Sequence, residues 1–78
     1  MDIKQMVQRY ENNPYGLGCD GIDTTESNKY AILSFESKYD RDKVYDELLS
    51  KGINKNSMKK NKPIHNNILY KYEIILFY

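Results

Sequence analysis

The sequence has few of the residues that cross-link small proteins or bind metals. Its 78 residues include one cysteine, Cys19, and one histidine, His65. A single cysteine cannot form an intramolecular disulfide, and the two residues cannot supply the four ligands of a structural zinc site. Small secreted domains usually contain several cysteines, so we expect a cytoplasmic protein with no bound metal.

Long apolar segments are also missing. The longest, Ile74 to Tyr78, is far shorter than the roughly 18 residues that a membrane-spanning helix needs, and the N-terminal residues do not resemble a signal peptide. Isoleucine, leucine, valine and phenylalanine supply only 18 residues, and eight tyrosines add further apolar area. This composition predicts one domain over residues 1–78 with a thin, tyrosine-rich core and no membrane contact.

Two segments have the apolar spacing of amphipathic helices. The first carries a stripe made of Ile3, Met6, Val7 and Tyr10. It predicts a helix over 2–12, which ends before Pro14 because the residue preceding a proline is disfavoured in the helical region. The second helix is predicted over 38–51, with Ser37 as its N-cap and Gly52 just beyond its end.

Three segments are predicted as strands. A weak strand is expected over 15–20, where apolar residues alternate with glycines, and a better one over 29–36, with Ala31, Leu33 and Phe35 facing the core. The third covers 68–78, and the lysine-rich segment 54–67 before it is expected to be a long loop. The order α-β-β-α-β predicts a small two-layer α+β domain. We expect a three-stranded, mainly antiparallel sheet with both helices on one face and the first strand between the other two.

No catalytic or cofactor motif survives a test of its context. Gly16 to Gly21 matches G-x-G-x-x-G, but the strand before and the helix after that a dinucleotide site needs are missing, so we interpret it as a turn or a bulged strand. Asp20, Asp23 and Glu26 do not have the spacing of a calcium loop. Nothing in the sequence pairs Cys19 with His65. We therefore expect no cofactor and no catalytic residue, and therefore not an enzyme. A small nuclease or toxin dependent on His65 is the third interpretation.

Charge is distributed unevenly along the chain. Residues 1–50 contain six Lys or Arg and ten Asp or Glu, whereas residues 51–72 contain six lysines and no acid. Two surfaces of opposite sign are therefore expected. The predicted acidic partner-binding surface consists of Asp20, Asp23, Glu26, Glu36, Asp40, Asp42, Asp46 and Glu47. The predicted aromatic contacts near the C-terminus are Tyr72, Phe77 and Tyr78.

These features favour a small protein-binding modulator or inhibitor. Lysine, asparagine, isoleucine and tyrosine supply 34 residues while alanine occurs once, a bias typical of A/T-rich genes. In size and coding bias the chain is similar to small phage-encoded modulators of host machinery, including anti-CRISPR proteins, a similarity that carries no residue across. We expect it to act in the host cytoplasm by occupying the nucleic-acid-binding surface of a host protein, and a homodimer through the C-terminal strand is compatible with this. The alternative is a nucleic-acid-binding accessory protein that uses Lys55, Lys59, Lys60, Lys62 and Tyr70.

Overall fold

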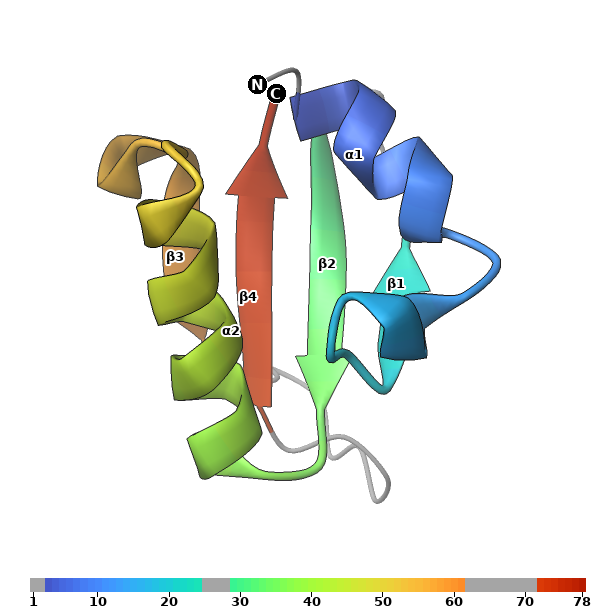
Figure 1. Cartoon of the computed structure of the whole chain (residues 1–78), viewed down its shortest axis with the longest axis vertical. Coiled ribbons are helices and arrows are strands. Elements are labelled where there is room, and N and C mark those ends of the chain that lie inside the picture. Colours follow the sequence, from blue (N-terminus) through green and yellow to red (C-terminus); the bar gives the residue numbers. More distant parts are fainter. Residues whose placement is uncertain (1–2, 25–28, 62–71) are drawn as a thin grey trace.

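The computed structural model describes residues 3–24, 29–61 and 72–78. Among the described residues, each α-helix is followed by a 3-10 helix and then by two strands, and the strands share one sheet (Figure 1). In chain order the elements are α1 (Ile3–Tyr10), the 3-10 helix η1 (Pro14–Gly16), β1 (Gly21–Asp23), β2 (Tyr30–Phe35), α2 (Lys38–Ser50), the 3-10 helix η2 (Lys55–Ser57), β3 (Met58–Asn61) and β4 (Tyr72–Phe77).

The sheet is antiparallel throughout, with strand order β1-β2-β4-β3. Both α-helices lie on the same face of it (Figure 1). This arrangement confirms the predicted two-layer α+β class. Among the described residues, no helix combines the length and the apolar character needed to cross a bilayer.

The predicted number and order of strands were wrong. A fourth strand, β3, lies within the segment that was expected to be a loop, of which residues 62–67 lie outside the described part of the chain. The sequence of β3 shows no apolar alternation, because Met58 is its only buried residue. Its lysines are typical of exposed edge strands. Since β3 reverses the chain after α2, β4 runs antiparallel to β2 and pairs with it directly, which leaves β1 at the sheet edge.

The weak strand predicted over 15–20 is instead a turn. Pro14 begins η1, and the backbone N–H of Cys19 donates to the carbonyl of Pro14 at 3.0 Å. Gly18 has a φ of +93°, a left-handed conformation that is incompatible with a regular strand and favours glycine. The glycine-rich segment therefore folds back on itself before β1 begins at Gly21.

The core lies between the sheet and the two α-helices. Strand β2 buries Ala31, Leu33 and Phe35 completely, as predicted. The predicted N-cap of α2 is also confirmed, because the Ser37 hydroxyl accepts a hydrogen bond from the backbone N–H of Asp40 at 3.3 Å. The remaining buried apolar residues are Met6, Val7, Leu17, Cys19, Val44, Leu48, Ile53, Met58, Ile74 and Leu76. We call this helix-packed side of the sheet the covered face and the opposite side the open face.

Candidate functional site

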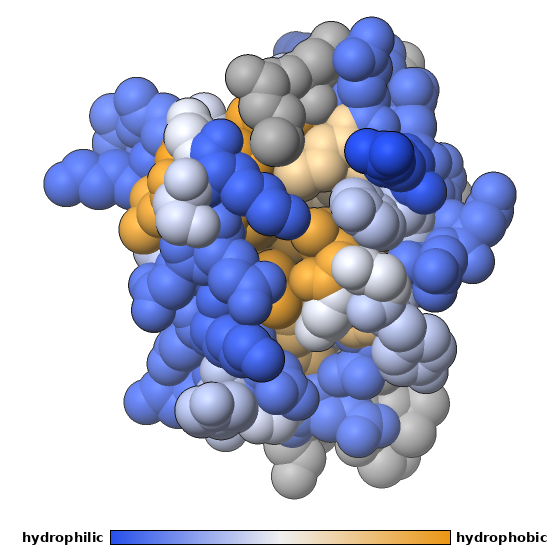
Figure 2. All heavy atoms as spheres, in the orientation of Figure 1, coloured by the Kyte–Doolittle hydropathy of each residue, from blue (hydrophilic) through white to orange (hydrophobic). Residues whose placement is uncertain are grey.

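A groove of about 280 Å³ lies between the turn that follows η1 and the helix α2. Figure 2 shows apolar atoms at the bottom of a hollow, with the polar surface of α2 along one side. The lining residues are Tyr15, Gly16, Leu17, Gly18, Asp40, Lys43, Val44 and Glu47. Leu17 and Val44 contribute apolar surface to this groove, and three charged side chains of α2 line it.

Helical spacing places the polar wall of this groove. Asp40, Lys43 and Glu47 are separated by three and four residues, so their side chains lie along one side of α2. The opposite wall approaches closely because Gly18 has no side chain. A Cβ added at Gly18 would lie 3.0 Å from Cγ2 of Val44. The groove is therefore narrow at this point, and Tyr15, another of its lining residues, is 74% exposed.

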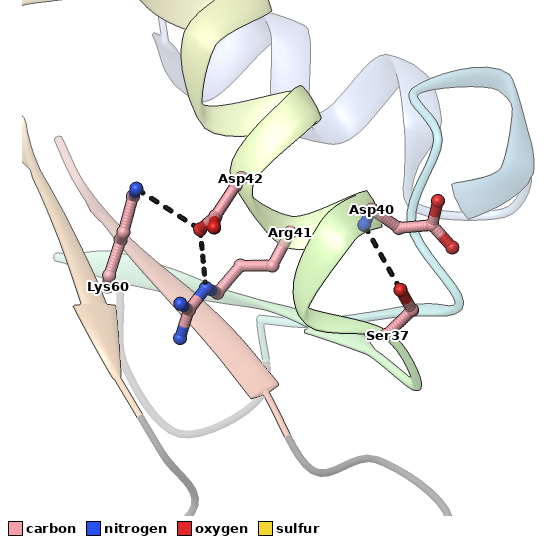
Figure 3. A network of polar contacts seen from close by, with 5 residues as sticks. All are labelled: Ser37, Asp40, Arg41, Asp42 and Lys60. Atoms are coloured by element: carbon pink, nitrogen blue, oxygen red, sulfur yellow. Dashed lines mark hydrogen bonds and ion pairs between the residues drawn. The ribbon is translucent and has the colours of Figure 1, made fainter.

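The two carboxylates of the groove have no ion-pair partner among the described residues. Asp40 and Glu47 are both exposed, and Lys43 lies between them in the helix. Figure 3 shows the carboxylate of Asp40 directed away from the ion pairs that Asp42 forms on the other side of the helix. The two carboxylates outnumber the single ammonium of Lys43 in this groove, and the exposed ring of Tyr15 also lines it. Charge and the ring's cation–π surface therefore favour a cationic ligand over an anionic one.

Two other predicted acids are occupied within the fold. The Asp20 carboxylate accepts a hydrogen bond from the backbone N–H of Glu36 at 2.8 Å. Asp42 lies 3.1 Å from both Nζ of Lys60 and Nε of Arg41 (Figure 3). The hydrogen bonds from Lys60, and then from Arg41, hold the pKa of the Asp42 carboxyl below its usual value, against an opposing effect of burial.

The other predicted acids do not join the groove. Glu36 and Asp46 are exposed but do not line it, and Asp23 lies in β1. Glu26 lies outside the described residues. Of the eight acids predicted to form one surface, only Asp40 and Glu47 line the groove together.

The predicted basic residues point in different directions. Lys60 lies on the covered side, where its ammonium is 4.6 Å from the centre of the Tyr45 ring, whereas the neighbouring Lys59 is on the open face. Lys55 belongs to η2. Lys62 and Tyr70 lie outside the described residues. The described lysines therefore do not line one continuous track.

The three predicted aromatic contacts have different environments. The Arg41 guanidinium lies 5.2 Å from the centre of the Tyr72 ring, and Tyr72 packs against the core. Tyr78 also packs against the core, and its hydroxyl donates to the carbonyl of Tyr30 at 3.3 Å. Phe77 is 42% exposed, with its ring centre 6.2 Å from that of Tyr30. Phe77 is thus the member of the set with an exposed ring.

Cys19 is buried, and its environment favours the protonated thiol. Burial, reinforced by the nearby charge of Asp20, raises the pKa of this thiol to about 12. It is therefore not a thiolate nucleophile near neutral pH, and His65 lies outside the described residues. In the part of the chain that the structure describes, no three His, Cys, Asp or Glu residues are placed to hold a metal ion.

Sequence reasoning missed the role of Tyr15 in this site. Alternation placed it in a strand, but Pro14 before it and glycines after it are the residue types of a turn, which exposes a side chain at its tip. The spacing of Asp40, Lys43 and Glu47 would also have shown that they share one side of the helix. Comparisons of this chain with protein-family models, with curated proteins and with solved structures found no match.

Proposed function

We propose that this chain is a small, non-enzymatic modulator that binds a partner protein through the groove between η1 and α2. The groove receives a lysine or arginine side chain of the partner. The observation that supports this proposal is the pair of carboxylates on Asp40 and Glu47, without ion-pair partners among the described residues, beside the exposed ring of Tyr15.

The physical chemistry of the groove favours a cationic side chain on a protein. The apolar floor, to which Leu17 and Val44 contribute, accepts the methylene stem of a lysine or arginine while its charge reaches the carboxylates. The ring of Tyr15 adds a cation–π surface at the rim. Tyrosines are also enriched among the residues that dominate protein interfaces.

The proposed target is a basic, phosphate-binding surface of a host protein. Such a surface exposes lysines and arginines that normally contact nucleic acid phosphates. Carboxylates that pair with these cations exclude the phosphates, so binding inhibits the partner's contact with nucleic acid. The same carboxylates repel nucleic acid from this chain, and Lys59 and Lys60 lie on opposite sides of β3. Direct nucleic-acid binding is therefore the weaker alternative.

The test is an amide NMR titration of the full chain with a tetraarginine peptide as the probe. We expect shift changes to cluster at residues 15–18 and 40–47 and to weaken with added salt. Glu47→Lys should weaken the apparent affinity by about fivefold or more, since it reverses a charge in the groove.

Asp46→Lys is the matched control, because it makes the same charge change on the preceding residue of α2, outside the groove. It should change the affinity by less than about twofold, because only a long-range charge effect remains and salt screens it. Equal losses in both variants, or shift changes spread evenly over the surface, would contradict the proposed site.

A further inference from the structure

The strand pairing aligns residues of the open face in rows across the sheet. In the central row, Asp23 of β1 lies opposite Ile32 of β2, which lies opposite Ile75 of β4, which lies opposite Lys59 of β3. Residues paired across antiparallel strands point to the same face. The row therefore carries an acid at one edge, two isoleucines at its centre and a lysine at the other edge.

The adjacent rows extend this pattern along the strands. On one side, Tyr30 pairs with Phe77, and their rings are in contact, with centres 6.2 Å apart. On the other side, the row is polar and consists of Gly21, Ser34, Glu73 and Asn61. The centre of the open face is thus a patch of isoleucine and aromatic side chains between charged edges.

This patch is separate from the core. Tyr30, Ile32 and Ile75 are only partly buried, Phe77 is 42% exposed, and none of them belongs to the core cluster under the helices. Both α-helices lie on the other side of the sheet (Figure 1). Apolar residues gathered on a face that no described helix covers are typical of a surface that is buried in an assembly.

We propose that a second copy of this chain covers the open face and that the two copies form a twofold-symmetric dimer. A twofold axis parallel to the strands, between β2 and β4, places the β1 edge of each copy over the β3 edge of the other. Asp23 of each copy then faces Lys59 of the second copy, and Ile32 lies over Ile75. A twofold axis across the strands would place like charges together, so the central row selects the first arrangement.

The size of the face sets the expected affinity. The two central strands have six residues each, β1 has three and β3 has four. At about 3.3 Å per residue and about 4.8 Å between strands, the face covers about 300 Å² in each copy. This is small beside the roughly 800 Å² per partner of a standard stable interface. The dimer should be weak and depend on concentration. Its grooves lie on the outward helix layers, so each dimer presents two of them.

Sedimentation equilibrium of the full chain from about 10 to 500 µM tests this inference independently of the groove. Wild type should approach twice its 9.3 kDa mass at the upper end. Ile75→Glu should stay monomeric, because it buries a charge at the centre of the interface. Leu49→Glu is the matched control, since this residue of α2 is 37% exposed on the helix layer, and it should associate as wild type does.

A charge exchange separates this arrangement from other uses of the patch. Asp23→Lys and Lys59→Asp should each weaken association by about tenfold, and the double variant should restore it to within about threefold of wild type. Circular dichroism checks that each variant is folded. A wild type that remains monomeric at the highest concentration, or a double variant no better than the single ones, would overturn the proposal. A monomeric wild type would leave the patch to a different partner, and the result of the groove titration would not depend on it.

Discussion

Ile74 and Ile75 are neighbours in β4, and their side chains leave the strand on opposite faces of the sheet. Ile74 is fully buried under the helices, whereas Ile75 is partly exposed in the central row of the open face. The same alternation holds in β2, where Leu33 is fully buried and Ile32 is not. Identical or similar residues one position apart therefore have different environments.

The comparison shows that apolar residues lie on both faces of one sheet but are fully buried on only one of them. On the covered face, apolar side chains pack against Val44 and Leu48 of α2 and against the residues of α1. On the open face, similar side chains have charged residues at both ends of their row, and neither of the described α-helices lies over them. The two central strands thus contribute to the core on one side, and on the other side they carry the patch that we propose to be a dimer interface.

The largest effect should come from the matched pair Ile74→Ala and Ile75→Ala. Removing a fully buried isoleucine leaves a cavity, so Ile74→Ala should lower the free energy of unfolding by about 3 kcal/mol. Ile75→Ala should cost less than about 1 kcal/mol when the chain is monomeric, because much of that side chain's surroundings is solvent. Urea denaturation at low micromolar protein concentration measures both. Equal losses would contradict the division between faces.

An intermediate effect should follow from two glycines with nearly the same backbone conformation. Gly18 and Gly52 have φ values of +93° and +94°, so alanine is strained at both, by about 1 kcal/mol. At Gly18 the new Cβ would also lie 3.0 Å from Val44, whereas at Gly52 nothing lies within 4 Å.

Gly18→Ala should therefore destabilise the chain by about 1 kcal/mol more than Gly52→Ala, and it should also shift the amide resonances of the groove. Urea denaturation and amide spectra of both variants test how closely the turn packs on α2. Equal destabilisation by the two substitutions would show that the turn moves away from α2 without cost.

The smallest effect concerns the neighbouring lysines of β3, which point to opposite faces. Because Lys60 lowers the pKa of Asp42 in the folded chain, this pair stabilises the fold above the unfolded-state pKa of the carboxyl. That contribution is lost as the pH falls below about 4 and through the folded-state value. Lys60→Gln should therefore make stability decline less steeply on acidification.

Lys59→Gln is the control, because Lys59 faces the open side. It should leave the acid dependence as in wild type when urea denaturation is followed from about pH 5 to pH 2. A change of the acid limb in Lys59→Gln, with none in Lys60→Gln, would contradict the ion-pair assignment.

The sequence predicted those elements whose pattern of apolar and capping residues matches their burial and their ends in the fold. Alternation identified β2 and its buried residues, and the Ser37 cap identified the start of α2. It failed at β3, where an edge strand carries two adjacent lysines and a single buried methionine, so no period of two is visible. It failed again after Pro14, where glycine conformation converts an alternating pattern into a turn.

The site was predicted only in part for a similar reason. Asp40 and Glu47 were among the candidate acids, but residue type alone cannot separate them from Asp20 and Asp42, whose carboxylates are bound within the fold. Likewise Tyr72 and Tyr78 have the residue type of an interface, while their rings pack against the core. The partners that decide these roles come from elements distant in the sequence.

The most direct test of the account is the fluorescence anisotropy of two labelled ligands of opposite charge, a tetraarginine peptide and a single-stranded oligonucleotide. Each is titrated with the wild-type chain at about 50 mM and about 200 mM salt. The chain has a formal net charge of +1 at pH 7, so its overall charge favours neither ligand strongly and a preference reports local sites. The account predicts that the peptide binds and that the oligonucleotide does not. Oligonucleotide binding that falls steeply with salt, without peptide binding, would contradict it.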